Sequence, residues 1–143
     1  MMRAFSLAEA REWLQATLAG ARTDAGELWF DGFSTDIRLV GDGQLFVALR
    51  GERFDGHEFL GQALTQGAVA AVVDTEVTDV AIPQLVVSDT VQALADLASA
   101  NRSGSAARLV AITGSSGKTT VREMTGAILA GMGPTLVTEG NLN

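Results

Sequence analysis

The chain of 143 residues lacks cysteine and carries few basic side chains. Without thiols, neither a disulfide framework nor a thiolate metal site can form, and a reducing, cytoplasmic location is expected. The sequence has ten Lys and Arg residues and 17 Asp and Glu residues, which gives a formal net charge of −7. Because a sequence-independent hold on nucleic acid needs clustered positive charge, no nucleic-acid partner is expected.

Long apolar runs are also missing. No segment approaches the ~18 consecutive apolar residues of a membrane span, so no membrane insertion is expected. The N-terminal segment carries Glu9, Arg11 and Glu12 where a signal peptide would be apolar. Hydrophobic residues nevertheless make up 47% of the chain, which is enough for the core of one domain or two small ones.

The apolar pattern alternates between helix and strand periods, which is typical of an α/β fold. Ser6 and Glu9 have capping-box spacing, and the apolar residues that follow them predict a helix over residues 6–19. Short strands are predicted around residues 28–33, 45–49, 69–73 and 85–87, and further helices after residues 57 and 89.

Residues 113–120 read Thr-Gly-Ser-Ser-Gly-Lys-Thr-Thr and follow the apolar run 109–112, a predicted strand. Glycines let backbone N–H groups wrap around phosphate, Lys118 can reach the β- and γ-phosphates, and the Thr119 hydroxyl can hold Mg²⁺. A nucleoside triphosphate is therefore expected, although a plain Gly/Ser turn between a strand and a helix is the alternative. The expected contacts are Thr113, Gly114, Ser115, Ser116, Gly117, Lys118, Thr119 and Thr120.

The position of the phosphate loop indicates how the chain is divided into domains. Its helix, starting near Lys118, should bury Val121, Met124, Thr125, Ile128 and Met132, and another strand should begin at 135–137. One such unit is half of a nucleotide-binding domain. We therefore predict a small, complete α/β module over residues 1–88 and the incomplete beginning of a P-loop α/β domain over residues 89–143.

Several motifs together resemble the ATP-dependent Mur ligases of peptidoglycan synthesis, along the whole chain. The missing first glycine of the general P-loop pattern, replaced here by Ile112, fits the Thr-Gly-x-x-Gly-Lys-Thr loop of that family. Ser115-Ser116 and Glu123-Met124 favour the branch that adds D-alanyl-D-alanine over the diaminopimelate- or lysine-adding branch. The motifs are residues 34–38, 43–57, 113–120, 122–124 and 140–143.

This resemblance implies a ligase that uses ATP and Mg²⁺ to activate the terminal carboxylate of UDP-N-acetylmuramoyl-tripeptide as an acyl phosphate, which the amine of D-alanyl-D-alanine attacks. Lys118 and Thr119 would be catalytic, with further Mg²⁺ ligands beyond the chain end. The resemblance covers roughly the N-terminal third of a three-domain enzyme. The chain alone is therefore expected to be inactive, and the full-length enzyme to be a monomer.

The resemblance also implies a pocket for the UDP part of the substrate. Taken alone, Thr35, Asp36 and Arg38 fit a polar strand end with a local ion pair better than a binding site, because such pairs are common at surfaces, and His57 fits a solvated loop. In the family the first three belong to the nucleotide pocket, with Arg38 suited to a diphosphate; Ile37 stands where Ser or Thr is common. The remaining residues implied in substrate binding are Arg50, Gly51, Asp55, His57 and Asn141.

Two other functions are open on the sequence. The chain could be a finished module that binds a UDP-sugar without turnover. It could also be a small P-loop kinase or nucleotidase, which would need a second acidic, metal-binding strand that the sequence does not provide.

Overall fold

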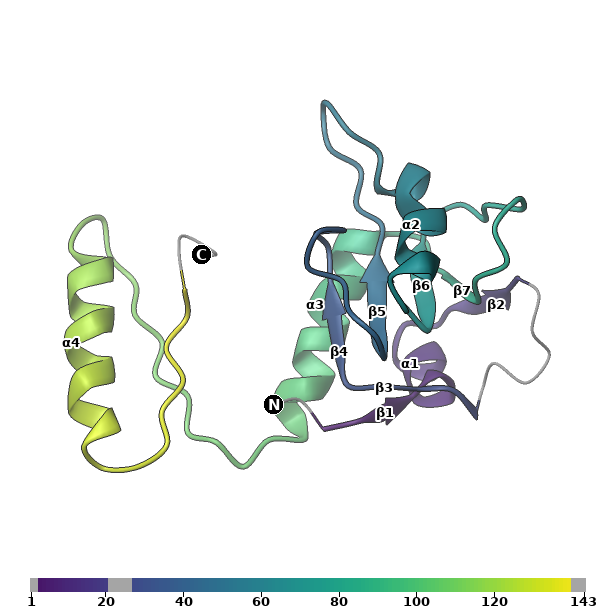
Figure 1. Cartoon of the computed structure of the whole chain (residues 1–143). Coiled ribbons are helices and arrows are strands. Elements are labelled where there is room, and N and C mark those ends of the chain that lie inside the picture. Colours follow the sequence, from purple (N-terminus) through teal and green to yellow (C-terminus); the bar gives the residue numbers. More distant parts are fainter. Residues whose placement is uncertain (1–2, 21–26, 140–143) are drawn as a thin grey trace. The chain divides into compact units, whose positions relative to one another are not determined.

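Short apolar strands form the centre of the first part of the chain. The computed structural model describes residues 3–20 and 27–139, and the chain forms two units, residues 1–106 and 107–143. In the first unit, five strands make a sheet in the order β2-β7-β6-β5-β4 (Figure 1). Its strands are β2 (Thr17–Ala19), β4 (Gly32–Ser34), β5 (Gln44–Val47), β6 (Ala70–Val73) and β7 (Gln84–Val86).

The remaining elements of this unit cover or border the sheet. Strands β1 and β3 pair antiparallel as a separate two-stranded sheet. The elements are β1 (Phe5–Ser6), α1 (Leu7–Trp13), β3 (Trp29–Phe30), the 3₁₀ turn η2 (Gly56–Phe59), α2 (Leu60–Thr65) and α3 (Thr90–Ser103).

Each face of the sheet has its own apolar core, because successive strand residues point to opposite faces. Leu45 and Val47 of β5 pack with residues of α1 and α3 on one face. Phe46 and Ala48 pack with Leu60 of α2 on the other. The mixed α/β fold predicted from the sequence is confirmed.

Within the described five-stranded sheet, β4, β5, β6 and β7 run parallel and β2 is antiparallel to its neighbour β7. Parallel neighbours end at the same edge of a sheet, where loops after adjacent strands meet. The segments that follow β4, β5 and β6 therefore lie close together.

The first helix is shorter than the predicted 6–19. The Ser6–Glu9 capping box is present, but the helix ends at Trp13, and Gln15 has a left-handed backbone with φ 50°. Thr17 to Ala19 then form β2 against β7. The prediction was wrong at this end because Leu18 continues the helical spacing although it belongs to a strand.

Helix α3 belongs with the first unit, whereas the sequence analysis placed the boundary near Ser88. Asp89 caps this helix by accepting hydrogen bonds from the Val91 and Gln92 N–H groups, at 2.8 and 3.1 Å. Its Ala93 and Leu97 are buried in the core beneath the sheet. The two units divide at residues 106 and 107, beyond the helix.

The second unit contains α4 (Lys118–Ala130), which begins where the sequence predicted. The predicted strands at 109–112 and 135–137 are not formed, since neither has a partner strand among the described residues. The predicted buried face of α4 is also wrong: Val121, Met124 and Ile128 are exposed. The segment after the helix does pack on it, because Gly126 faces Val137 too closely to admit a side chain.

Over the described ranges 3–20 and 27–139, no helix is long and apolar enough to cross a membrane.

Replacing Leu45 by alanine tests the parallel core. Leu45 is 0% exposed, so Leu45→Ala should lower the free energy of unfolding by about 2–5 kcal/mol through lost burial and a residual cavity. The matched control is Leu39→Ala, at a side chain that is 73% exposed, with an expected change within about 0.5 kcal/mol. Urea unfolding measures both, and equal effects would contradict the described packing.

Candidate functional site

A cavity of about 400 Å³ lies where the chain leaves β4 and β5. Two segments far apart in the sequence form its wall because β4 and β5 are parallel neighbours with Ser34 opposite Phe46. One segment is the turn after β4 and the other is the loop and 3₁₀ turn after β5. The lining residues are Thr35, Asp36, Ile37, Arg38, Phe46, Phe54, Gly56 and Phe59.

The turn after β4 is held by its own side chains. The Ser34 hydroxyl accepts the Asp36 N–H at 3.1 Å and donates to the Asp36 carbonyl at 3.0 Å. Asp36 Oδ1 accepts hydrogen bonds from the backbone N–H of Arg38 at 3.0 Å and from the Arg38 Nε–H at 2.9 Å. Hydrogen bonds from Arg38 lower the pKa of Asp36 to about 2. The guanidinium is thereby oriented, although 82% of the Arg38 side chain remains exposed.

Aromatic side chains supply the apolar part of the cavity. Phe46 is buried in the sheet, whereas Phe54 is 56% exposed. The Gly51 N–H donates to the Phe54 carbonyl at 2.9 Å, which closes the loop that carries Phe54. The sequence analysis did not assign Phe46, Phe54 or Phe59 to a site. Their clustering around the glycine-bearing segment 51–56 was the signal that could have indicated an apolar pocket.

Behind this loop, four charged or titratable side chains form a closed network. Arg50 Nη1 lies 2.9 Å from Asp55 Oδ2, and Arg50 Nη2 lies 2.9 Å from Asp74 Oδ1. His57 Nδ1 lies 2.6 Å from Asp55 Oδ1, and the Asp74 N–H donates to His57 Nε2 at 3.2 Å. The network therefore joins the loop after β5 to the end of β6.

Electrostatics within the network stabilise both carboxylates. The backbone N–H of His57 donates a hydrogen bond to Asp55 and thereby lowers the pKa of that carboxyl. The Arg50 guanidinium lowers the pKa of Asp74. Sequence reasoning missed Asp74, whose only signal was its place directly after the apolar run 69–73.

The predicted substrate-binding residues thus fall into two groups. Thr35, Asp36 and Arg38 line the cavity. Arg50, Gly51, Asp55 and His57 lie in the adjoining loop, outside the lining set, and the His57 side chain is only 7% exposed. Ile37, which replaces a hydroxyl residue common in the family, packs against the core on the α2 face. Asn141 lies outside the described residues.

The phosphate loop precedes α4 in the second unit. Gly117, with φ 74°, is the N-cap of α4, and no side chain caps the helix. Lys118 Nζ donates to the Gly114 carbonyl at 2.7 Å, so the lysine folds back over the loop. It is the only lysine in the sequence. Uncapped N–H groups at a helix N-terminus beside a lysine form a site that fits phosphate.

A smaller cavity of about 250 Å³ adjoins this loop. Lys118, Thr119 and Arg122 line it together with residues 110–112 and Thr138. Among the residues that the structure describes, no cluster of three or more His, Asp or Glu could hold a metal ion. A Mg²⁺ ion here would rely on the Thr119 hydroxyl and on nucleotide phosphates.

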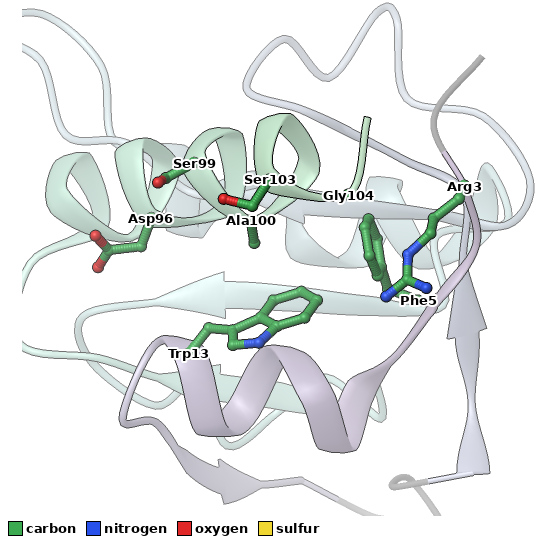
Figure 2. A pocket seen from close by; sticks show the side chains of 8 residues that line it. All are labelled: Arg3, Phe5, Trp13, Asp96, Ser99, Ala100, Ser103 and Gly104. Carbon is green, nitrogen blue, oxygen red and sulfur yellow. The ribbon is translucent and has the colours of Figure 1, made fainter. Parts of the chain in front are cut away.

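Another hollow of the first unit lies between α1 and α3 and measures about 550 Å³. Figure 2 shows Arg3, Phe5 and Trp13 on one side and Asp96, Ser99 and Ser103 of α3 on the other. Its charged groups are already paired: Arg3 with Glu9 at 3.4 Å and Asp96 with Gln92 at 2.9 Å. Without convergent unpaired polar groups, it is a weaker candidate than the cavity beside β4 and β5.

A model of the Mur ligase family, catalytic domain, matches residues 30–102. The chain belongs to the Mur ligase family. It is 46% identical over 142 residues to the UDP-N-acetylmuramoyl-tripeptide--D-alanyl-D-alanine ligase of Escherichia coli, covering 99% of this chain. This Mur ligase chain spans about 30% of that relative's length.

Solved structures agree with this assignment. A crystal structure of MurF from Acinetobacter baumannii superposes with a TM-score of 0.85 at 38% identity, covering 99% of this chain and 31% of that one. MurF ligase from Thermotoga maritima, in complex with ADP, gives a TM-score of 0.68 at 35% identity over 78% of this chain and 26% of that one.

The Asp36–Arg38 pair predicts a measurable titration. The folded pKa of Asp36, about 2, lies below its ordinary value of about 3.9. The pair's contribution to stability is therefore complete above about pH 4 and is lost as the pH falls through 2. In a carbon-13 NMR titration, Arg38→Ala should raise the Asp36 pKa towards about 3.9, whereas Arg11→Ala should leave it unchanged. An unaltered midpoint in Arg38→Ala would refute the pairing.

Proposed function

We propose that this Mur ligase chain supplies the UDP-substrate pocket and the triphosphate loop of an ATP-dependent ligase that joins D-alanyl-D-alanine to UDP-N-acetylmuramoyl-tripeptide. The observation that carries the proposal is the 46% identity, along almost the whole chain, to the E. coli protein of that name. The chain spans about 30% of that protein, so the activity is proposed for an enzyme of which these residues form a part.

The second unit supports the use of ATP. Its loop has the residue types and the helix N-terminus that phosphate needs, and the T. maritima relative was solved with ADP. In the proposed complex, the N–H groups of residues 114–119 surround the phosphates, and Lys118 exchanges the Gly114 carbonyl for a phosphate oxygen. Thr119 would hold Mg²⁺, which offsets negative charge on the transferring phosphoryl group.

The proposed chemistry proceeds in two displacements. A carboxylate oxygen of the tripeptide attacks the γ-phosphorus of ATP, forming an acyl phosphate and releasing ADP. The amine of D-alanyl-D-alanine then attacks the acyl carbon, forming the amide and releasing phosphate and a proton. Lys118 and the loop N–H groups stabilise charge in the first displacement, the step for which this chain provides groups.

The first unit supports binding of the UDP group. The exposed ring of Phe54 offers a stacking surface for a base, and the oriented, solvent-accessible guanidinium of Arg38 offers paired donors for a diphosphate. Thr35 adds a hydroxyl at the same wall. We assign Thr35, Asp36 and Arg38 to this pocket and place the enzyme in the cytoplasm, as the lack of cysteine suggests.

A UDP-sugar-binding module without turnover is the second candidate. The observation that favours it is the first unit itself, which has a core on each face of its sheet within residues 1–106. Turnover separates the two functions, since a pure binding module makes no use of the phosphate loop.

A chimera tests the ligase. This chain replaces the aligned segment of the E. coli relative, and formation of the UDP-muramoyl-pentapeptide is measured with ATP and D-alanyl-D-alanine. The chimera should be active, and Lys118→Met should lower kcat by about 10²-fold or more, because a group that stabilises transition-state charge is lost.

The control is Arg11→Ala, an exposed charge on α1, which should leave kcat within about twofold. A folded chimera without product, or one in which Lys118→Met matches the control, would refute the ligase proposal. Binding of UDP-N-acetylmuramoyl-tripeptide without any turnover would favour the binding module.

A further inference from the structure

We propose that His57 is a positioning residue: through Asp55 and the backbone of Asp74, it fixes the loop of residues 51–54 and sets Phe54 over the cavity, without touching the nucleotide. The inference rests on the proposed function for the identity of the ligand. It differs from the direct substrate contact expected for His57 from the family resemblance.

Both ring nitrogens of His57 are engaged by the protein. The Asp74 N–H lies 3.2 Å from Nε2, and Nδ1 lies 2.6 Å from Asp55 Oδ1, so each ring nitrogen has a hydrogen-bond partner within the protein. Asp74 Oδ1 also lies 3.2 Å from Nε2, but it already accepts hydrogen bonds from Arg50 and Thr75. With 7% of its side chain exposed, the imidazole has no edge to offer a ligand.

The two partners of the His57 ring, Asp55 and Asp74, anchor the loop. Asp55 caps η2 by accepting the His57 N–H at 3.0 Å, and it forms a bridge with Arg50 across the base of the loop. Asp74 directly follows β6, a rigid central strand with all four residues buried. The imidazole thus connects the loop to the sheet.

The base of the loop also lies very close to the residues that follow β5. A Cβ on Gly56 would lie 2.9 Å from the Ala48 Cα and from backbone atoms of Leu49. The Gly56 N–H donates to the Leu49 carbonyl at 2.8 Å. The base of the loop is therefore held twice, through Gly56 against Leu49 and through His57 against Asp74.

The test uses the 143-residue chain and two readouts, amide hydrogen exchange of Gly51 and the Kd for UDP-N-acetylmuramoyl-tripeptide. His57→Phe keeps the ring but loses both hydrogen bonds. It should speed Gly51 exchange about tenfold and weaken binding about tenfold, as expected for the loss of one or two net hydrogen bonds. His57→Asn, which retains a donor towards Asp55, and His57→Gln, which retains an acceptor for Asp74, should fall between.

The matched control is Gln84→Met in β7. The buried Gln84 side chain also makes two hydrogen bonds, both to the backbone of Val77 at 2.9 and 2.7 Å. Gln84→Met should lower the melting temperature yet change neither Gly51 exchange nor the Kd. If His57→Phe behaves in the same way, His57 is only structural and the inference is overturned.

A double-mutant cycle with Phe54→Ala separates positioning from direct contact. If His57 acts through the loop, adding His57→Phe to Phe54→Ala should weaken binding by no more than about twofold further. Fully additive losses would show that His57 contacts the ligand and would overturn the inference. If the unmodified chain fails to bind, the UDP proposal fails for this chain, while Gly51 exchange still decides whether His57 holds the loop.

Discussion

The parallel register of β4, β5 and β6 is the constraint on which the candidate pocket depends. It brings three loop segments to one edge of the sheet, although they are separated by more than ten residues in the sequence. Asp36 and Arg38 come from the first, Phe54 and His57 from the second, and Asp74 from the third. A different strand order would separate Arg50 and His57 from Asp74, and the turn after β4 from Phe54.

The two units solve the burial of apolar surface differently. The first has a core on each face of its sheet and satisfies its charged groups in local networks at the edge. In the second, the apolar side chains of α4 are exposed and the flanking segments have no partner strands among the described residues. The phosphate loop and its lysine are nonetheless set by local geometry alone, because the loop closes on itself through Lys118 and Gly114.

Local signals predicted local structure well. The Ser6–Glu9 capping box and the start of α4 at Lys118 were read from neighbouring residues and are confirmed. The predicted end of α1 was wrong. Leu18 has the spacing of a helical apolar residue, but it lies in β2, where it pairs with Leu85. The role of Asp74 could not be predicted from the sequence, because its ion pair with Arg50 depends on which strands are neighbours and not on spacing along the chain.

We propose that the nucleotide group binds at the edge of the sheet where β4 and β5 end. Nitrogen-15 NMR of the 143-residue chain, titrated with UDP-N-acetylmuramoyl-tripeptide, tests it most directly. The largest amide shift changes are expected in residues 34–38 and 51–59. Changes confined to the hollow between α1 and α3, or no saturable change at all, would contradict it.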